Sequence, residues 1–140
     1  MQKIKKDLAF SIDFEGFAEG MEESFFIEEE IPRFKILNEL TRNVEHVLSF
    51  LDKNNIIATF FILGWIARKF PEIIKNISKH GHEIASHSYY HKRLFNLPDS
   101  KIFNYINDSK KILEDVSGGQ VVGFRAPDFS INEFNDFFFY

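Results

Sequence analysis

Two histidines and two carboxylates stand at spacings that suit metal binding. His87 and His91 are one helical turn apart, which would let two imidazoles reach the same metal ion. A histidine pair alone more often has a surface or packing role. A carboxylate that follows another strand would complete the two-histidine, one-carboxylate set of a zinc site with an open position. Asp13 and Glu15 can supply it, and we expect both to face the site only if the chain turns at Phe14.

Arg125 is a third charged position that follows an apolar stretch. It is either a surface cation beside a turn or the partner of a carboxylate. Its rigid guanidinium suits a bidentate pair with Asp13, which would keep that carboxylate ionised and oriented. Because the acids, the histidines and this arginine all follow apolar stretches, we favour the second interpretation.

The other three histidines are weaker candidates, because the sequence places no carboxylate beside any of them. We expect His46 on a solvated helix face and His80 at a helix end, where a cation is favoured. We expect His82 to be a hydrogen-bonded residue at the start of a strand. All three are therefore predicted to lie outside the site.

Alternating strands and helices must position these residues. Apolar runs predict strands at 8–12, 56–63, 82–86 and 121–124, and the first two are expected to be buried. Strands separated by helices form right-handed βαβ units with a parallel sheet or barrel, whose strands end on one shared face. The acids, the histidines and the arginine would meet there. Amphipathic spacing and stop signals predict helices from Thr41, from Trp65, from Pro71 to Gly81, and from a cap at Asp99 or Ser100 to Gly118.

The composition excludes several classes of protein. A chain of 140 residues has room for one domain, 1–140, and its formal charge of −4 argues against nucleic acid as a partner. The absence of cysteine excludes disulfides and thiolate metal sites. No apolar run approaches the roughly 20 residues of a membrane span, and the run after the basic N-terminus is too short for a secretory signal. We therefore expect a cytoplasmic protein, with a missing export signal as the alternative.

Two further segments carry expectations of their own. The acidic stretch 14–32 is predicted to be a long solvated loop. The aromatic run from Phe137 to Tyr140 is predicted to belong to a structural element that is cut short. About four strand–helix units fit into the chain, whereas a complete eight-unit barrel takes about 250 residues. The chain is therefore expected to be a fragment.

The motif order Asp-x-Glu at 13–15, His-x-x-x-His at 87–91 and Arg-x-Pro at 125–127 resembles that of a known family. These are similar to the first three motifs of the polysaccharide deacetylases, the NodB-homology or carbohydrate esterase family 4 domain. The segments 58–64, 81–88 and 123–127 also look like family segments, and the likeness runs from Leu8 to Ile131. The resemblance implies an α/β fold, a deformed (β/α) barrel incomplete at its C-terminus. It also implies removal of N- or O-acetyl groups from the sugars of a polysaccharide or oligosaccharide.

The resemblance also implies roles for single residues. Asp13 matches the catalytic base, Arg125 the arginine that orients the base, and His87 and His91 the ligands of a divalent metal, expected to be Zn²⁺. Glu15 is expected as the third metal ligand, although many members place the metal-binding acid directly after the base and Glu15 stands one residue later. A subgroup linked to exopolysaccharide production and exosortase systems has a similar Asp-x-Glu, although it usually has an aspartate where this chain has Gly16. By the same resemblance, Pro127 of the third motif is expected at the substrate.

Two alternatives remain beside the deacetylase. In the family a later histidine protonates the departing amine, and the sequence has no histidine after His91. The first alternative is therefore a catalytically incompetent fragment that binds metal or glycan. The second is a related amidohydrolase that acts on a small cyclic amide, since Asp-x-Glu motifs also occur in such relatives.

Overall fold

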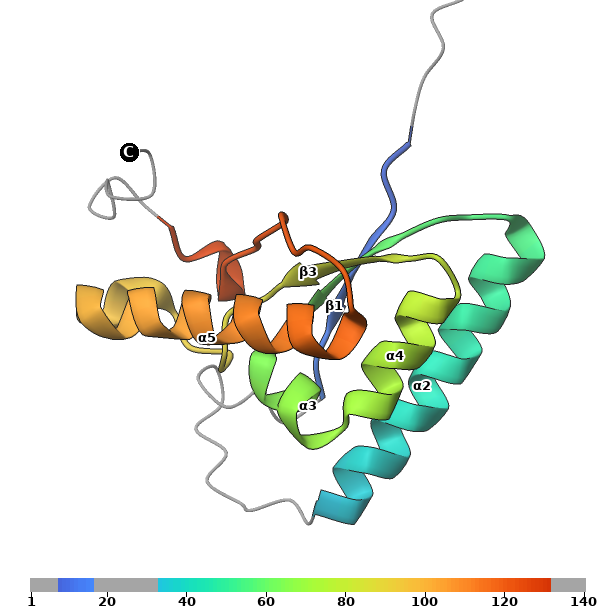
Figure 1. Ribbon diagram of the computed structural model, residues 1–140, viewed down its shortest axis with the longest axis horizontal. Helices are drawn as coiled ribbons and strands as arrows, with labels where there is room; N and C mark the ends of the chain where they lie inside the picture. Colours follow the sequence, from blue (N-terminus) through green and yellow to red (C-terminus); the bar gives the residue numbers. More distant parts are fainter. Residues whose placement is uncertain (1–7, 17–32, 132–140) are drawn as a thin grey trace, which may run out of the picture.

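The computed structural model of the chain describes residues 8–16 and 33–131. Most of the predicted acidic loop and the whole aromatic run from Phe137 to Tyr140 lie outside these residues. The described residues form a three-stranded parallel sheet with helices packed against it (Figure 1), which confirms the predicted α/β class. None of the described helices combines the length and the apolar character that a bilayer-spanning helix needs. The predicted cytoplasmic location stays a prediction.

Each strand is shorter than the apolar run that predicts it. Pairing begins where the Phe10 carbonyl accepts the Thr59 N–H at 3.0 Å. Earlier residues have no partner strand in the described part of the chain, and Leu8 is 90% exposed. None of the residues 8–12 is buried, so the prediction of a buried strand there is wrong, although 11–12 do belong to a strand. The three parallel strands, adjacent in the order of the chain, are β1 (Ser11–Phe14), β2 (Thr59–Ile62) and β3 (Glu83–Ser86).

The predicted fourth strand at 121–124 is reduced to a single bridge between Phe124 and Ser86. The ladder stops after it for two reasons. The Arg125 carbonyl is occupied by His87 Nδ1, at 2.8 Å. Pro127 has no N–H to donate at the next pairing position. The segment therefore runs beside β3, but the prediction of a full strand is wrong.

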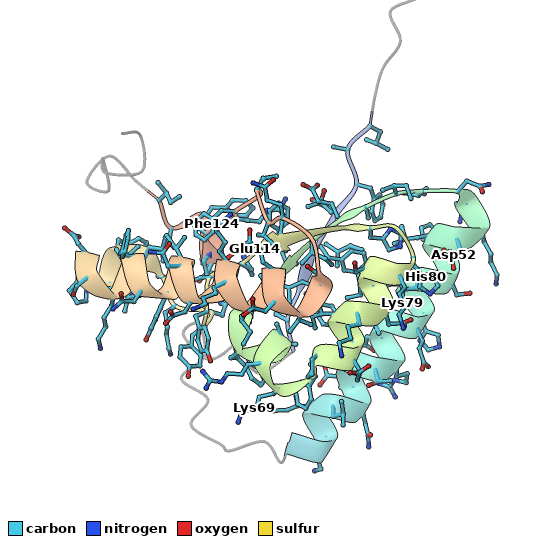
Figure 2. All side chains as sticks on the ribbon, viewed as in Figure 1. Asp52, Lys69, Lys79, His80, Glu114 and Phe124 are labelled. Atoms are coloured by element: carbon cyan, nitrogen blue, oxygen red, sulfur yellow. The ribbon has the colours of Figure 1, made fainter. Side chains whose placement is uncertain are left out.

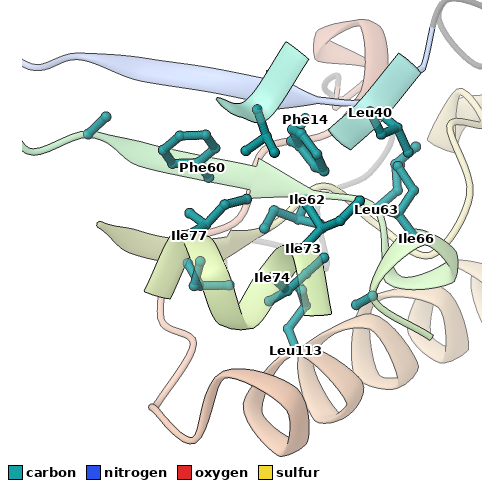
Figure 3. Close-up of a cluster of buried hydrophobic side chains, with 14 of the residues drawn as sticks. Phe14, Leu40, Phe60, Ile62, Leu63, Ile66, Ile73, Ile74, Ile77 and Leu113 are labelled. Carbon is teal, nitrogen blue, oxygen red and sulfur yellow. The ribbon is translucent and has the colours of Figure 1, made fainter. Parts of the chain in front are cut away.

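Alternating side chains give the sheet two different faces. Phe14, Phe60 and Ile62 point to one side and are buried in the hydrophobic core (Figure 3). Asp13 and Phe61 are cross-strand neighbours that point to the other side. The polar side chains of the candidate site therefore use the face of the sheet opposite to this core.

The helix that opens the second described segment begins earlier than predicted. It starts at Arg33 rather than Thr41, because Leu40 and Ile36 continue its apolar stripe toward the N-terminus. It lies beside the helix that opens at Pro71 (Figure 1). The helices of the described residues are α2 (Arg33–Asn54), α3 (Gly64–Lys69), α4 (Pro71–Lys79) and α5 (Asp99–Ser117), with 3₁₀ turns η1 (Leu94–Asn96) and η2 (Pro127–Phe129).

Most predicted helix ends agree with the structure. Pro71 is the first residue of α4, and Gly81 follows that helix with φ +81°. Gly118 ends α5 in the left-handed region, with φ +73°. The predicted side-chain cap of α5 is wrong, because Pro98 occupies the capping position and Asp99 is the first helical residue. There the Asp99 carboxylate favours the helix dipole instead.

The main hydrophobic core joins the sheet to the helices (Figure 3). β2 contributes Phe60 and Ile62, α4 contributes Ile74 and Ile77, and α5 contributes Leu113, all fully buried. Burial of a side chain of this size stabilises the fold by about 1.5–3 kcal/mol. The core therefore fixes the strands whose ends carry the polar residues.

Candidate metal centre

Three potential ligand atoms meet at the carboxyl ends of β1 and β3. Glu15 directly follows β1, His87 directly follows β3, and His91 lies in the loop after it. Glu15 Oε2 is 3.0 Å from His91 Nε2 and 3.8 Å from His87 Nε2. All the ligand atoms lie within 4.8 Å of one another. The structure thus brings together the three residues that are predicted from the sequence to be metal ligands.

The two separations from Glu15 suit the binding of one divalent ion. Zinc binds histidine nitrogens and carboxylate oxygens at about 2.0–2.2 Å, and tetrahedral geometry then sets ligand atoms about 3.4 Å apart. The two separations from Glu15 Oε2, 3.0 and 3.8 Å, bracket that distance. His87 and His91 are buried and Glu15 is partly buried. Two imidazoles and one carboxylate leave a fourth position open, as catalytic zinc sites do.

Asp13 and Glu15 reach the same side of the sheet without a turn between them. Phe14 continues β1 and is buried in the core. Side chains two residues apart on an extended chain share a face. The expectation that the chain must turn at Phe14 is therefore wrong, and ordinary strand alternation places both acids on the site face.

The stretch from His87 to His91 is a loop and not a helical turn, although the two histidines have the spacing of one. Ser88 has φ +69°, a left-handed conformation that redirects the chain after β3. The two imidazole rings end with their centroids 5.2 Å apart and their planes at 60°. The loop, rather than helical spacing, brings the two side chains to one place.

The Arg125 carbonyl fixes the orientation of His87. It accepts a hydrogen bond from His87 Nδ1 at 2.8 Å, which leaves the Nε2 lone pair facing Glu15. Burial lowers the pKa of His87, and it outweighs the opposing effects of that hydrogen bond and of the Asp13 charge. The imidazole is therefore held neutral, the form that binds metals. No side-chain pattern in the sequence could reveal this contact, because the acceptor is a backbone atom.

Arg125 pairs with Asp13, but not in the predicted bidentate form. Its Nη1 donates to Asp13 Oδ1 at 2.5 Å, while its Nη2 donates to Ser11 Oγ at 2.9 Å. The guanidinium also stacks on Phe61, with Cζ 4.0 Å from the ring centroid. The two guanidinium nitrogens have different partners because Ser11 and Asp13 lie two residues apart on the same face of β1. No motif in the sequence indicates Ser11 and Phe61 as contacts of Arg125, although the strand register places them on the same face as Asp13.

Pro127 lies two residues after Arg125 and is buried. It opens η2, and its carbonyl accepts the Ser130 N–H at 3.0 Å. The turn continues with Asp128, which has φ +50° and pairs with Arg93 Nε at 2.7 Å. The assignment of Pro127 to substrate binding stays a prediction.

The remaining histidines lie away from these ligands, as predicted, but His80 has a carboxylate partner that no pattern in the sequence indicates. Its Nδ1 is 3.0 Å from Asp52 Oδ2, where α2 and α4 end side by side (Figure 2). His82 is buried, and its Nδ1 accepts the Ala58 N–H at 3.4 Å. His46 is exposed on α2. Neither Asp52 nor His80 reaches the ligand cluster.

Known proteins share both the sequence and the fold. A sequence model of the family described as polysaccharide deacetylase matches residues 33–134. The chain is 39% identical over 81 residues to a peptidoglycan-N-acetylglucosamine deacetylase of Bacillus cereus, covering 58% of this chain and 30% of that protein. A Mycobacterium smegmatis protein assigned to the polysaccharide deacetylases has a similar fold. The TM-score is 0.70 and the identity 30%, over 89% of this chain and 44% of that one.

One similar structure belongs to a protein without native activity. It is a mutant, with restored enzymatic activity, of a CE4 family pseudoenzyme from Bacillus anthracis. The TM-score is 0.62 and the identity 26%, over 64% of this chain and 33% of that one. The chain spans 19–30% of the length of the first curated relatives that it matches.

The fold and the family agree. The parallel sheet and its helices form part of the deformed (β/α) barrel that the motifs imply. The exosortase-associated subgroup stays a prediction. Because the family's sequence model matches most of the residues, and relatives of the same kind match in sequence and in fold, this chain belongs to the polysaccharide deacetylase family.

Proposed function

We propose that this chain provides the metal-binding part of a hydrolase that removes acetyl groups from the N-acetylated sugars of a polysaccharide. The observation that carries the proposal is the convergence of Glu15, His87 and His91 within 4.8 Å. The Bacillus cereus relative is named for peptidoglycan N-acetylglucosamine. A polymer that contains N-acetylglucosamine is therefore the substrate class we propose, with Pro127 near the bound sugar.

Glu15, His87 and His91 would hold a divalent cation, for which zinc is the proposed identity. When bound, zinc supplies Lewis acidity that polarises an acyl oxygen. His87 is prepared for this role by the Arg125 carbonyl, which fixes its Nδ1–H and turns Nε2 toward Glu15. The mixed nitrogen and oxygen donor set, without thiolate, suits a zinc site that works on a carbonyl substrate.

Asp13 is the proposed catalytic base. Arg125 Nη1 donates to its Oδ1, which holds the carboxylate in a fixed orientation. We assign Oδ2 as the atom that takes a proton from the attacking water. The water oxygen forms a bond to the acetyl carbon, the carbon–nitrogen bond breaks, and the proton that Asp13 took passes to the departing sugar nitrogen. The products are acetate and a free amine on the sugar.

A second candidate function is binding of metal or glycan without turnover. The similarity to a CE4 family pseudoenzyme favours it, since that fold does not always carry native activity. In that case the ligands Glu15, His87 and His91 would still bind zinc. Catalysis is therefore the property that separates the two candidates.

The test is mass spectrometry of an acetylated chitooligosaccharide incubated with the full chain and zinc. We expect products that have lost acetyl groups, and we expect the loss to disappear in Asp13→Asn. Asp13→Asn keeps the size of the side chain and removes its charge, so zinc content should stay the same. Zinc binding without loss of acetyl groups would establish the second candidate instead.

A further inference from the structure

A buried pair of serines lies behind the loop that carries the two histidines. Ser86, the last residue of β3, and Ser109, on α5, are 2% and 0% exposed. Ser86 Oγ donates to Ser109 Oγ at 2.9 Å. Burying two hydroxyls costs desolvation free energy, which the hydrogen bond between them does little more than offset. An apolar pair would serve helix packing at least as well, so the hydroxyls point to another role.

Ser86 holds the backbone on both sides of His87. Its hydroxyl oxygen accepts the Ser88 N–H at 3.2 Å, and Ser86 itself immediately precedes His87. Strand alternation turns Ser86 toward α5 and His87 toward the opposite face, where Glu15 lies. A displacement of Ser86 therefore moves the His87 imidazole relative to its neighbours.

Gly64 allows α5 to come close enough for this contact. A Cβ at Gly64 would lie 2.9 Å from Ser109 Cα and 2.9 Å from Tyr89 Cδ2. The Gly64 N–H also donates to the Ser88 carbonyl at 2.9 Å, and the Trp65 N–H donates to the Tyr89 carbonyl at 3.2 Å. The beginning of α3 thus holds the histidine loop from one side, while Ser109 holds it from α5.

We propose that Ser109 is a positioning residue that acts through Ser86 to aim His87 at Glu15 and His91. The inference rests on the proposed metal site, and it adds to that site a support that comes from a different element, α5. Residues that orient metal ligands from behind typically change metal affinity about 10–100-fold when they are replaced. Ser109→Ala should weaken zinc binding by an amount in that range.

The experiment measures zinc affinity of the full chain by competition with a chromophoric chelator. Ser109→Ala is compared with Leu113→Val, a change one turn further along α5 in the main core. The cobalt(II) absorption spectrum, recorded at saturation, reports the ligand geometry and does not respond to a loss of global stability. Ser86→Ala and Ser109→Ala each remove the hydrogen bond between the two serines. The double variant should therefore bind zinc no more weakly than whichever single variant binds it less tightly.

Weaker zinc binding and an altered cobalt spectrum in Ser109→Ala, with neither change in Leu113→Val, support the inference. Unchanged affinity and spectrum in Ser109→Ala overturn it, and so does equal weakening in Leu113→Val. If the unaltered chain binds no zinc, the proposed function fails. The role of Ser109 in holding the loop is then tested separately by hydrogen exchange of the Ser88 amide, which donates to Ser86 Oγ, in the metal-free protein. Faster exchange in Ser109→Ala, but not in Leu113→Val, would show that Ser109 holds the loop in place. Equal exchange in the unaltered chain and in both variants would overturn the inference.

Discussion

His87 and Arg125 each use one part of the side chain for support and another for the site. His87 Nδ1 donates a hydrogen bond to a backbone carbonyl, while its Nε2 faces the ligand cluster. Arg125 gives Nη2 to Ser11 and Nη1 to Asp13. In each side chain one hydrogen bond fixes the orientation in which another atom faces its partner in the site. Such supporting contacts make a site rigid.

Arg125→Lys tests the shared guanidinium. A lysine ammonium is a point charge that cannot keep the planar fork between Asp13 and Ser11 or the stacking on Phe61. Loss of a charge-assisted hydrogen bond of about 1.5–3 kcal/mol corresponds to roughly a 10–100-fold fall in kcat/KM for deacetylation. Steady-state kinetics on a chitooligosaccharide would measure it.

Ser11→Ala is the matched control for that prediction. It removes the Nη2 contact and leaves the Asp13 contact in place. We expect a smaller fall in kcat/KM than in Arg125→Lys, with unchanged zinc content in both variants. An equal or larger effect of Ser11→Ala would show that the Asp13 pair is not the decisive contact.

His82 makes the stability of the fold depend on pH. Burial lowers the pKa of His82, and the nearby His80 lowers it further, while Asp52 acts in the opposite direction. The folded state therefore holds His82 neutral. The stability from this group is present above the pKa of an unfolded histidine, about 6.5, and is lost as the pH falls through the lower pKa of the folded state.

His82→Asn should reduce this loss of stability in acid. An asparagine Oδ1 can accept the Ala58 N–H that His82 Nδ1 now accepts, and it does not titrate. Urea unfolding between about pH 7 and pH 5 should show a smaller decrease in the free energy of unfolding for the variant. The same decrease in both proteins would exclude His82 as a source of the pH dependence.

At the scale of the elements, the loop after β3 is held from both sides. α3 donates two backbone N–H groups to it, and α5 contacts the end of β3 through Ser109. Figure 1 shows α5 passing in front of the sheet with α3 beneath it. The close packing of these elements depends on the missing side chain of Gly64.

Gly64→Ala should therefore destabilise the chain. The new methyl group would meet backbone Cα of Ser109 at 2.9 Å, and backbone atoms cannot rotate away. Overpacking of this kind costs about 1–3 kcal/mol, more than the helix propensity gained from alanine. Gly119→Ala is the control, because its Cβ would meet only Ser117 Oγ, at 4.0 Å. Urea midpoints that fall equally in the two variants would contradict the close approach of α5.

The sequence predicts the type of most elements better than their limits. Apolar periodicity predicts α2, but the start of α2 depends on Leu40 and Ile36, which continue the same stripe further back. The run at 121–124 looks like a strand, yet Pro127 and the engaged Arg125 carbonyl end its pairing. Strand limits depend on the neighbouring backbone, which a single sequence does not contain.

The site shows the same division between residues that the sequence predicts and residues whose positions depend on neighbouring elements. The spacing and order of the motifs predict Glu15, His87 and His91, because parallel strands end on one face. The positions of Ser11 and Phe61 follow from register, and that of Ser109 from helix packing. None of these three has a motif of its own in the sequence.

At the scale of the whole molecule, the site joins segments that are distant in the sequence. Glu15 follows β1, the two histidines follow β3, and Arg125 stands after α5. A bound ion would therefore tie β1 to β3. Zinc that binds only the folded chain should raise its free energy of unfolding by about 2.7 kcal/mol at a free concentration 100 times the Kd.

This stabilisation is checked by thermal unfolding with zinc and with EDTA. The unaltered chain should unfold at a higher temperature in zinc, and EDTA should reverse the change. His91→Ala should lose the zinc effect while it keeps the fold in EDTA, since the fold rests on the hydrophobic core. A zinc effect of the same size in His91→Ala would point to ligands other than those proposed.

Zinc titration of the purified full chain by calorimetry tests the metal centre most directly. The arrangement of Glu15, His87 and His91 predicts one zinc ion per chain, the same stoichiometry in Asp13→Asn, and no binding in His87→Ala. Equal zinc stoichiometry and affinity in His87→Ala and in the unaltered chain would contradict the metal centre.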